Sequence, residues 1–568
     1  MEEEKKLTGY PSIDKPWLKY YSEEAINTPL PECTMYEYIW ENNKDYLSDI
    51  ALRYYGTKIS YGKLFENIKK AANAFYSMGV RDGDVVTIMS MHTPETVYAI
   101  YALSFIGATA NMAYMTLTEK EILATLKNTE SKLFLVLDAA LDKVDTLKGK
   151  ISIPVVVMSI TESMPFCMNI AYRMKTKAAK HNFIAWKDFL SQRAIEAAIS
   201  SNHAAPVVIV YTSGTTGEPK GVVLSSDNLN AVPAQLLKTD RNYQRQETFL
   251  HTIPIFVAFG IGMLHHGIST GICMILGIVT GFESMGKLFS KVKPQRFVSG
   301  PPVLDCIMKY TKGSLNHFID FTGGGEAIAP EKEEEFNRWL SDHHAKTRYF
   351  AGYGMSEFAS VAALNMKGAY KQGSVGIPLV YANIKVVDPV SCEIKKYNET
   401  GEICICAPNT MREYLKDPEA TAKAIEIDEA GRRWMHTGDL GYVDMDGFVF
   451  IVGRLKRVYL TRSTDGSIVK IYPQRIEDII KSNPLVENCG VITQKDEERI
   501  NYPIAFVTIK EDHDKDIIEQ LKALACRELP EYDCPEQFFI LDTMPMTASG
   551  KIDYRALEKM AKGGIPQA

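Results

Sequence analysis

The sequence lacks an excess of positive charge. It holds 64 lysine and arginine residues against 70 aspartate and glutamate residues, so the formal net charge at pH 7 is −6. Proteins that bind nucleic acid through its phosphate backbone need basic surfaces, and this balance gives no electrostatic reason to expect one. We therefore predict that nucleic acid is not a partner.

Cysteine is also scarce, with 10 residues among 568. Cys404 and Cys406 would place two thiols on one face of a strand, but no second pair of cysteines or histidines completes a zinc site. The charged first six residues show no apolar signal-peptide core. We therefore predict reduced thiols and a cytoplasmic protein.

Two segments raise the question of membrane contact. Residues 253–282 are apolar over a length that could cross a bilayer, but Pro254, two histidines and six glycines interrupt them. This composition favours a strand, a helix and a second strand inside a large core. Residues 164–183 mix apolar and basic side chains, and they could form either an exposed insert or a weak peripheral contact with a membrane.

The sequence has no Walker A motif and no protein-kinase signature. Its glycine-rich stretch is instead Tyr211-Thr-Ser-Gly-Thr-Thr-Gly-Glu-Pro-Lys-Gly221, between two short apolar runs typical of buried strands. Glycines let backbone N–H groups turn toward an anion, and hydroxyl and ammonium groups add donors. The loop therefore suits a polyphosphate, although a flexible surface loop would have a similar composition.

Helical and strand patterns alternate along the first part of the chain. Residues 61–75 and 93–105 have helical patterns, whereas residues 83–90 and 132–137 have the apolar pattern of buried strands. This alternation favours parallel α/β sheets. Further strands near residues 296, 321 and 348 end in glycines. Because ligands bind at the carboxyl ends of such strands, these glycine corners are candidates for approach to a nucleotide.

The predicted secondary structure changes in the later part of the chain. Short strands and turns dominate residues 385–453, and a compact mixture of helices and strands follows. We predict an α/β fold with a large N-terminal domain, residues 1–453, of parallel-type sheets with helices. Its β-rich subdomain spans residues 385–453. A hinge at 454–457 would connect it to a small, mobile α+β domain at 458–568.

Four further motifs accompany the glycine-rich loop. They are Tyr353-Gly-Met-Ser-Glu357, Thr437-Gly-Asp439, Gly453-Arg454 and Ser549-Gly-Lys551. In this order and at this spacing, the chain from about residue 35 to about 560 resembles the adenylate-forming superfamily. That superfamily includes acyl-CoA synthetases, luciferases and peptide-synthetase adenylation domains, and the chain is most similar to fatty- or aryl-acid CoA ligases.

The resemblance implies a nucleotide site. ATP would lie against residues of the loop, the glycine corners and the later motifs: Thr212, Ser213, Gly214, Thr215, Thr216, Gly217, Lys220, Gly324, Gly325, Glu326, Gly352, Tyr353, Gly354, Asp439 and Arg454. The loop would hold the β- and γ-phosphates. Tyr353 would stack on adenine, and Asp439 and Arg454 would contact the ribose.

The resemblance also implies a reaction. A carboxylic acid would attack the α-phosphate of ATP, pyrophosphate would leave, and the acyl group would pass from the adenylate to coenzyme A. Ser356 would touch the α-phosphate, Glu357 would ligate Mg²⁺, and Lys551 would be the mobile catalytic lysine. Lys456 matches the pivot about which the C-terminal domain rotates between the two steps.

Departures from the family pattern concern the substrates. Val257 replaces a histidine that is frequent in acyl- and aryl-CoA ligases, and no aspartate near residues 255–260 could bind an ammonium. We predict a pocket for a hydrophobic acid at Val257, Phe259, Gly325 and Gly352. The segment 459–473 is longer than the corresponding segment of the family, and it contains a turn at Asp465-Gly466. An acyl carrier protein could therefore replace coenzyme A as acceptor, and a non-catalytic nucleotide-binding protein is a third alternative.

Overall fold

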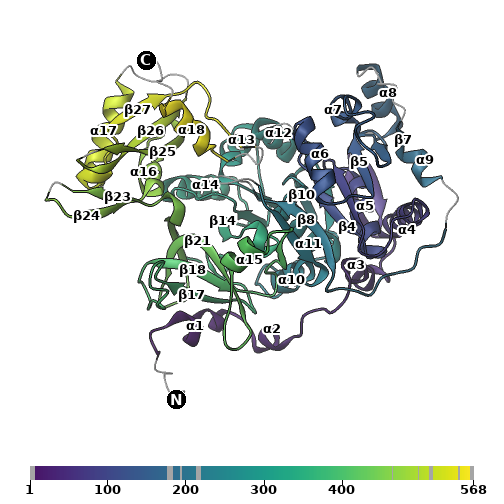
Figure 1. The fold of residues 1–568 in the computed structure, drawn as a ribbon, viewed down its shortest axis with the longest axis horizontal. Helices are drawn as coiled ribbons and strands as arrows, with labels where there is room; N and C mark the ends of the chain where they lie inside the picture. The colour runs from purple at the N-terminus through teal and green to yellow at the C-terminus, as the bar shows by residue number, and fades with distance from the viewer. Residues whose placement is uncertain are drawn as a thin grey trace.

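The protein is described here by a computed structural model that covers residues 7–175, 183–191, 195–212, 219–279, 281–463, 465–496, 498–510, 516–547 and 551–562. Two large sheets with helices fill the centre and right of Figure 1, a smaller sheet lies at the lower left, and the C-terminal part lies at the upper left. This arrangement confirms the predicted α/β fold class with a large N-terminal part and a small C-terminal part.

The first large sheet has nine strands in the order β16-β15-β14-β13-β12-β10-β11-β1-β2. The six strands from β14 to β1 in this order run parallel, and antiparallel pairs occupy both edges. The strand bounds are β1 (Ile50–Tyr54), β2 (Thr57–Ser60), β10 (Thr248–His251), β11 (Cys273–Leu276), β12 (Arg296–Ser299), β13 (Asp320–Gly323), β14 (Tyr349–Tyr353), β15 (Ala363–Leu364) and β16 (Ile377–Pro378).

The second large sheet has eight strands in the order β19-β9-β8-β4-β3-β5-β6-β7. Its strands from β8 to β7 in this order are parallel, whereas β9 and β19 are antiparallel additions at one edge. The bounds are β3 (Val85–Met89), β4 (Thr109–Met112), β5 (Leu133–Leu137), β6 (Val155–Met158), β7 (Ile184–Ala185), β8 (Pro206–Tyr211), β9 (Gly221–Ser225) and β19 (Glu413–Tyr414).

Two helices are apolar on nearly every side and lie inside the large core. All twelve residues of α5 (Pro94–Phe105) are buried, and α11 (Ala258–Ser269) is buried at every residue but Phe259. A helix that is hydrophobic all round belongs in a core. The apolar run at 253–282 is thus largely α11 followed by β11. Among the described helices, none combines the length and apolar character needed to span a membrane.

Amphipathic helices pack around this core. The sequence predicts helices at 61–75 and 93–105, and the structure confirms them as α4 (Tyr61–Ser77) and the buried α5. The other α-helices described before β14 are α1 (Pro11–Asp14), α2 (Glu23–Asn27), α3 (Met35–Asn43), α6 (Glu119–Asn128), α7 (Leu141–Asp145), α8 (Phe166–Lys175), α9 (Trp186–Leu190), α10 (Ser226–Leu236), α12 (Phe282–Val292), α13 (Leu304–Tyr310) and α14 (Pro330–Asp342).

The β-rich segment forms a separate antiparallel sheet. Its strands are β17 (Asn383–Val387), β18 (Gly401–Cys406), β20 (Ile425–Ile427), β21 (Arg433–Val443) and β22 (Val449–Arg454), with α15 (Pro418–Ala424) beside them. β21 pairs with β18, β20 and β22. Strand β21, which contains Asp439, is therefore held by pairing with three other strands.

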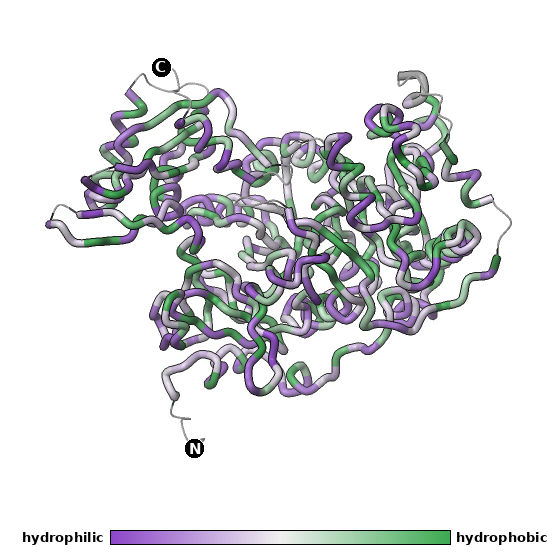
Figure 2. Tube along the Cα trace, viewed as in Figure 1, coloured by the Kyte–Doolittle hydropathy of each residue, from purple (hydrophilic) through white to green (hydrophobic). Residues whose placement is uncertain are grey.

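The C-terminal part has sheets of its own. β25 (Val486–Asp496), β26 (Ile500–Ile509) and β27 (Gln537–Ile540) form one sheet, packed with α16 (Pro473–Lys481), α17 (Ile517–Glu528) and α18 (Tyr554–Lys562). β23 (Tyr459–Arg462) and β24 (Ile468–Ile471) form the hairpin expected from Asp465-Gly466. The hairpin projects at the left edge of Figure 2, and its Leu460 and Ile468 are about half exposed.

Candidate active site

The glycine-rich loop connects β8 to β9, which are antiparallel neighbours. The Thr212 N–H donates to the Lys220 carbonyl at 3.0 Å, and the Lys220 N–H donates to Thr212 Oγ1 at 3.1 Å. These bonds close the base of the loop. Ser213, Gly214, Thr215, Thr216 and Gly217 lie outside the described residues, so their predicted phosphate contacts stay predictions.

The loop base lies close to the predicted metal-binding carboxylate. Strand β19 pairs with β9 so that Tyr414 stands opposite Val222, and Lys220 Nζ lies 4.6 Å from the centre of the Tyr414 ring. The Tyr414 hydroxyl donates to Glu357 Oε1 at 2.7 Å. Glu357, which lies in the short helix η4 (Ser356–Phe358) with Ser356, is 6% exposed. One tyrosine thus lies beside both the Lys220 ammonium and the buried Glu357 carboxylate.

Tyr414 is a site residue that sequence reasoning missed. It has no local signal, because only the pairing of two strands far apart in the sequence brings it to the loop. If its hydroxyl positions Glu357, Tyr414→Phe should raise the KM for ATP with Mg²⁺ about 10-fold, since a hydrogen bond to a charged group contributes roughly 1.5–3 kcal/mol. Tyr442→Phe, in a ring stacked on Phe450, is the matched control. Unchanged kinetics in Tyr414→Phe would refute this positioning role.

A bulge in β21 presents Asp439. Along β18 and β21, Cys404 pairs with His436 whereas Glu402 pairs with Leu440, so β21 carries two extra residues over this interval. Gly438 has φ of +69°, a conformation that glycine adopts without strain. The Gly438 N–H donates to Glu402 Oε1 at 3.0 Å, and Thr437 Oγ1 donates to the Ile403 carbonyl at 2.7 Å. Bulges of this kind redirect side chains beside functional sites.

Asp439 joins two other predicted nucleotide contacts. Its Oδ1 lies 2.8 Å from Arg454 Nε, and its Oδ2 accepts from the Tyr353 hydroxyl at 2.5 Å. Asp439 is 3% exposed, and burial raises its pKa although the charge of Arg454 acts in the opposite direction. A hydrogen bond and an ion pair therefore join Tyr353, Asp439 and Arg454 into one group, and their contacts with adenine and ribose stay predictions.

Lys551 faces the same place from the C-terminal part. Burial lowers its pKa, and so does the charge of Arg454, whereas the carboxylates of Glu326, Asp439 and Glu357 oppose this shift. The Lys551 ammonium therefore lies within electrostatic range of all four groups. The structure thus brings the C-terminal lysine to the nucleotide motifs of the N-terminal part.

The glycine corners meet at the carboxyl ends of β13 and β14. A Cβ atom placed on Gly324 would lie 3.4 Å from the Gly352 carbonyl and 3.8 Å from the Phe259 ring. A Cβ on Gly354 would lie 1.8 Å from the Ser360 carbonyl, so this position excludes any side chain. Phe259, Gly324 and Gly352 therefore come together, with Gly325 next in the chain and Val257 directly before α11. That Val257, Phe259, Gly325 and Gly352 line an acid pocket stays a prediction.

Two buried histidines hold the segment on both sides of Phe259. His92 Nε2 lies 2.5 Å from the Ile253 carbonyl, His251 Nε2 lies 2.9 Å from the Gly260 carbonyl, and the two rings are 4.9 Å apart. Burial lowers the pKa of His92 to about 4 and that of His251 to about 3, so both are neutral at pH 7. Sequence reasoning missed this pair, whose only signal is that each histidine ends or follows a buried strand.

The predicted pivot lies between the two parts of the chain. Lys456 is the central residue of η5 (Leu455–Arg457), which directly follows β22. Its neighbour Arg457 donates to Glu477 Oε1 at 2.6 Å and to the Val491 carbonyl at 3.0 Å, and it lies 3.7 Å from the centre of the Tyr554 ring. Arg457 is therefore anchored in the C-terminal part, one residue after Lys456.

Comparison with known proteins identifies the family. The model of the AMP-binding enzyme family matches residues 39–415, and the model of the AMP-binding enzyme C-terminal domain matches residues 475–551. The chain belongs to the AMP-binding enzyme family. This membership confirms the resemblance predicted from the five motifs. Both matches contain residues of the site above: the first spans the loop, Glu357 and Tyr414, and the second ends at Lys551.

Curated relatives cover nearly the whole of this AMP-binding family member. It is similar to a long-chain-fatty-acid–CoA ligase of Bacillus subtilis (strain 168), with 26% identity over 564 residues, 96% of this chain and 97% of the relative. It is also similar to a 4-coumarate–CoA ligase of Humulus lupulus, with 29% identity over 513 residues and 88% of each chain.

Solved structures share the fold. An anthranilate CoA ligase in complex with anthranoyl-AMP superposes with a TM-score of 0.79 at 20% identity, covering 94% of this chain and 98% of that one. The o-succinylbenzoate CoA synthetase of Bacillus subtilis, in complex with its acyl-adenylate, gives a TM-score of 0.75 at 23% identity, with coverage of 92% and 97%. At these identities the likeness concerns the fold alone.

Proposed function

We propose that this AMP-binding enzyme is an acid–thiol ligase that converts a hydrophobic carboxylic acid to an acyl-adenylate with ATP and then transfers the acyl group to coenzyme A. The observation that carries the proposal is the linked group of Tyr353, Asp439 and Arg454, with Lys551 within electrostatic range of Asp439 and Arg454. A phosphoryl site must stabilise charge that develops in the transition state, and fixed cations do so most effectively. Relatives over nearly the full chain are acid–CoA ligases.

The residues take the following roles in this proposal. Lys220 and the glycine-rich loop hold the β- and γ-phosphates, and Tyr353, Asp439 and Arg454 bind adenosine. Glu357, held by Tyr414, would ligate Mg²⁺, a hard cation that prefers carboxylate oxygen. Magnesium would neutralise charge on the leaving pyrophosphate. Ser356 lies beside Glu357 and would contact the α-phosphate, and Lys551 would stabilise the carboxylate and ribose–phosphate oxygens.

Two conformations of the chain serve the two steps. We take residues 1–453 as the large domain, 454–457 as the hinge and 458–568 as the small domain. β22 of the five-stranded sheet ends at Arg454, and among the described residues the strands that follow, β23 to β27, form two sheets without any earlier strand, which supports this division. Lys551 near Asp439 corresponds to the adenylation arrangement. Rotation about Lys456 would withdraw Lys551 and open the site to a thiol.

The acid is proposed to be apolar. Phe259 lies at the glycine corners, and the two histidines behind its segment are neutral, so neither offers a charge to a polar substrate. A zwitterionic amino acid would bury an ammonium without a partner, at a cost of several kcal/mol. A fatty or aryl acid places only apolar groups there.

ATP–pyrophosphate exchange over a panel of acids tests the function. We expect exchange with medium- or long-chain fatty acids or with aryl acids, and a CoA thioester once coenzyme A is added. Free α-amino acids should give exchange at least about 100-fold slower, because roughly 3 kcal/mol of ammonium burial is uncompensated. Efficient exchange with an amino acid would overturn the proposed acid class. Absence of exchange with every acid would overturn the enzyme assignment.

The thiol that accepts the acyl group distinguishes an acyl-CoA synthetase from the alternative, an adenylation enzyme that loads a carrier protein. The β23–β24 hairpin projects from the C-terminal part with apolar residues exposed, and a carrier protein could bind there. If the chain is an acyl-CoA synthetase, free coenzyme A suffices as acceptor. Thioester formation only with a pantetheinylated carrier protein would favour the alternative.

Membrane contact remains a separate proposal. Helix α8 exposes Phe166, Met168 and Ile170, with Phe166 82% exposed, whereas part of the 164–183 segment lies outside the described residues. An exposed apolar face beside basic residues can bind a membrane surface weakly. Co-sedimentation with anionic vesicles would measure this contact, and absence of binding at low salt would rule it out.

A further inference from the structure

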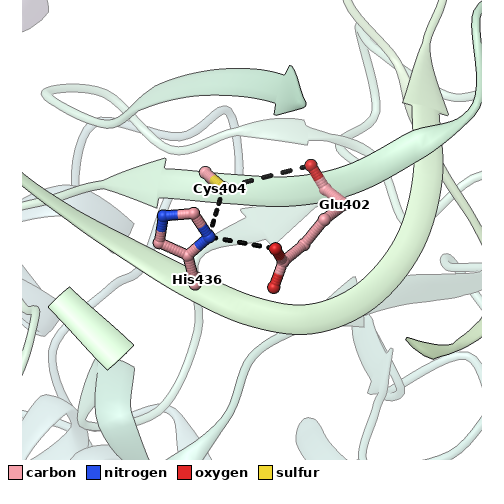
Figure 3. A group of neighbouring side chains, drawn as sticks. All are labelled: Glu402, Cys404 and His436. Atoms are coloured by element: carbon pink, nitrogen blue, oxygen red, sulfur yellow. Dashed lines mark hydrogen bonds and ion pairs between the residues drawn. The ribbon is translucent and has the colours of Figure 1, made fainter. Parts of the chain in front are cut away.

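Three side chains with metal-binding atoms meet on one face of the five-stranded sheet. They are Glu402 and Cys404 of β18 and His436 of β21 (Figure 3). Cys404 stands directly opposite His436 in the antiparallel register. His436 Nδ1 lies 2.9 Å from Glu402 Oε2 and 3.4 Å from Cys404 Sγ. All three potential ligand atoms lie within 4.8 Å of one another.

These distances suit a tetrahedral cation. Zinc binds sulfur at about 2.3 Å and nitrogen or oxygen at about 2.0–2.1 Å, so tetrahedral ligands lie roughly 3.3–3.5 Å apart. The separation of Nδ1 from Sγ already has this value, and that of Nδ1 from Oε2 needs to grow by only a few tenths of an ångström. Thiolate, imidazole and carboxylate are also the three side-chain ligand types that zinc prefers.

The surrounding groups resemble the outer shell of a metal site. The other ring nitrogen of His436, Nε2, lies 3.3 Å from Glu426 Oε2, and Lys385 Nζ lies 2.7 Å from the same carboxylate oxygen. Metal-binding histidines usually donate their second ring N–H to a carboxylate in this way, which orients the ring. Glu402 is held too, because its Oε1 accepts from the Gly438 N–H.

We propose that Glu402, Cys404 and His436 bind a divalent cation of the zinc class, with a fourth position open to water or another small ligand. The sequence predicts no zinc site at Cys404 because no second cysteine or histidine pair follows it. The strand register supplies the missing histidine from β21. This cation site is distinct from the magnesium site proposed at Glu357, because its ligands include sulfur and nitrogen rather than oxygen alone.

The position of the site links it to ATP binding. Glu402 contributes one carboxylate oxygen to the cluster and the other to the N–H of Gly438, which directly precedes Asp439. A cation that draws the Glu402 carboxylate toward itself therefore pulls on the bulge that presents Asp439. We expect occupancy to change the KM for ATP.

Metal binding by the full chain tests the proposal directly. Zn²⁺ alone is titrated against a chromophoric chelator, and Co²⁺ is followed by its thiolate absorption. We expect one cation per chain that Cys404→Ser loses, with affinity lowered more than about 100-fold. Glu426→Gln, which removes only the outer carboxylate, should lower affinity about 10–100-fold. Cys406→Ser, two residues along the same strand, is the matched control and should bind as the unaltered chain does.

Several results would overturn the site. They are Cys404→Ser binding with unaltered affinity, Cys406→Ser losing as much affinity as Cys404→Ser, and an unaltered chain that binds no Zn²⁺ in the titration. If Cys404→Ser does not fold, His436→Gln carries the same test, because the His436 side chain is 24% exposed and tolerates change better. A Zn²⁺ effect on the KM for ATP that persists in Cys404→Ser would refute the link to Asp439.

Discussion

Replacing Lys551 with alanine should lower the rate of acyl-adenylate formation about 10²–10³-fold, while thioester formation from supplied acyl-adenylate keeps its rate. The structure places Lys551 in electrostatic contact with Arg454, Glu326, Asp439 and Glu357. Removal of one preorganised donor from a site of developing negative charge costs rates of this order. ATP–pyrophosphate exchange measures the first step, and coenzyme A with pre-formed acyl-adenylate measures the second.

The split between the two steps is the decisive readout. Lys559→Ala removes an exposed lysine from the neighbouring helix α18 and should leave both rates unchanged. A merely structural role for Lys551 would slow both steps together. Equal losses in adenylation and thioester formation would therefore contradict the proposed role.

Lys456→Pro should preserve pyrophosphate exchange and reduce thioester output on the order of tenfold, which an added barrier of about 1.4 kcal/mol produces. Proline holds φ near −65° and removes a backbone donor, so it restricts rotation at this position. Arg457 anchors the next residue to Glu477 and Val491, so rotation of the C-terminal part must use the backbone just before it. The described arrangement, with Lys551 near Asp439, is the one that the substitution should retain.

Lys456→Ala is the control for this prediction, because it removes the side chain but leaves the backbone free. It should behave like the unaltered chain if the backbone is the pivot. Freezing in the other arrangement would invert the pattern, with exchange lost and thioester formation kept, and would also support a pivot. A stably folded Lys456→Pro with both rates unchanged would refute it.

The local elements of this fold follow from the sequence. Apolar spacing predicts α4 and α5, and the β-branched runs on either side of the glycine-rich loop predict β8 and β9. Asp465-Gly466 predicts the β23–β24 hairpin. Such features depend on residues that are neighbours in the chain, so their pattern is visible without tertiary structure. The order of the five motifs likewise indicates the family.

Pairing and register between strands that are distant in the sequence determine which side chains of the candidate sites become neighbours. Tyr414 reaches Glu357 because β19 pairs with β9, and Asp439 meets Tyr353 because a bulge redirects it from β21. Cys404 and His436 become neighbours only through the β18–β21 register. A shift of one residue in a register would turn each of these side chains to the opposite face. The sequence alone therefore determined which chemical groups are present, and tertiary pairing decided which of them touch.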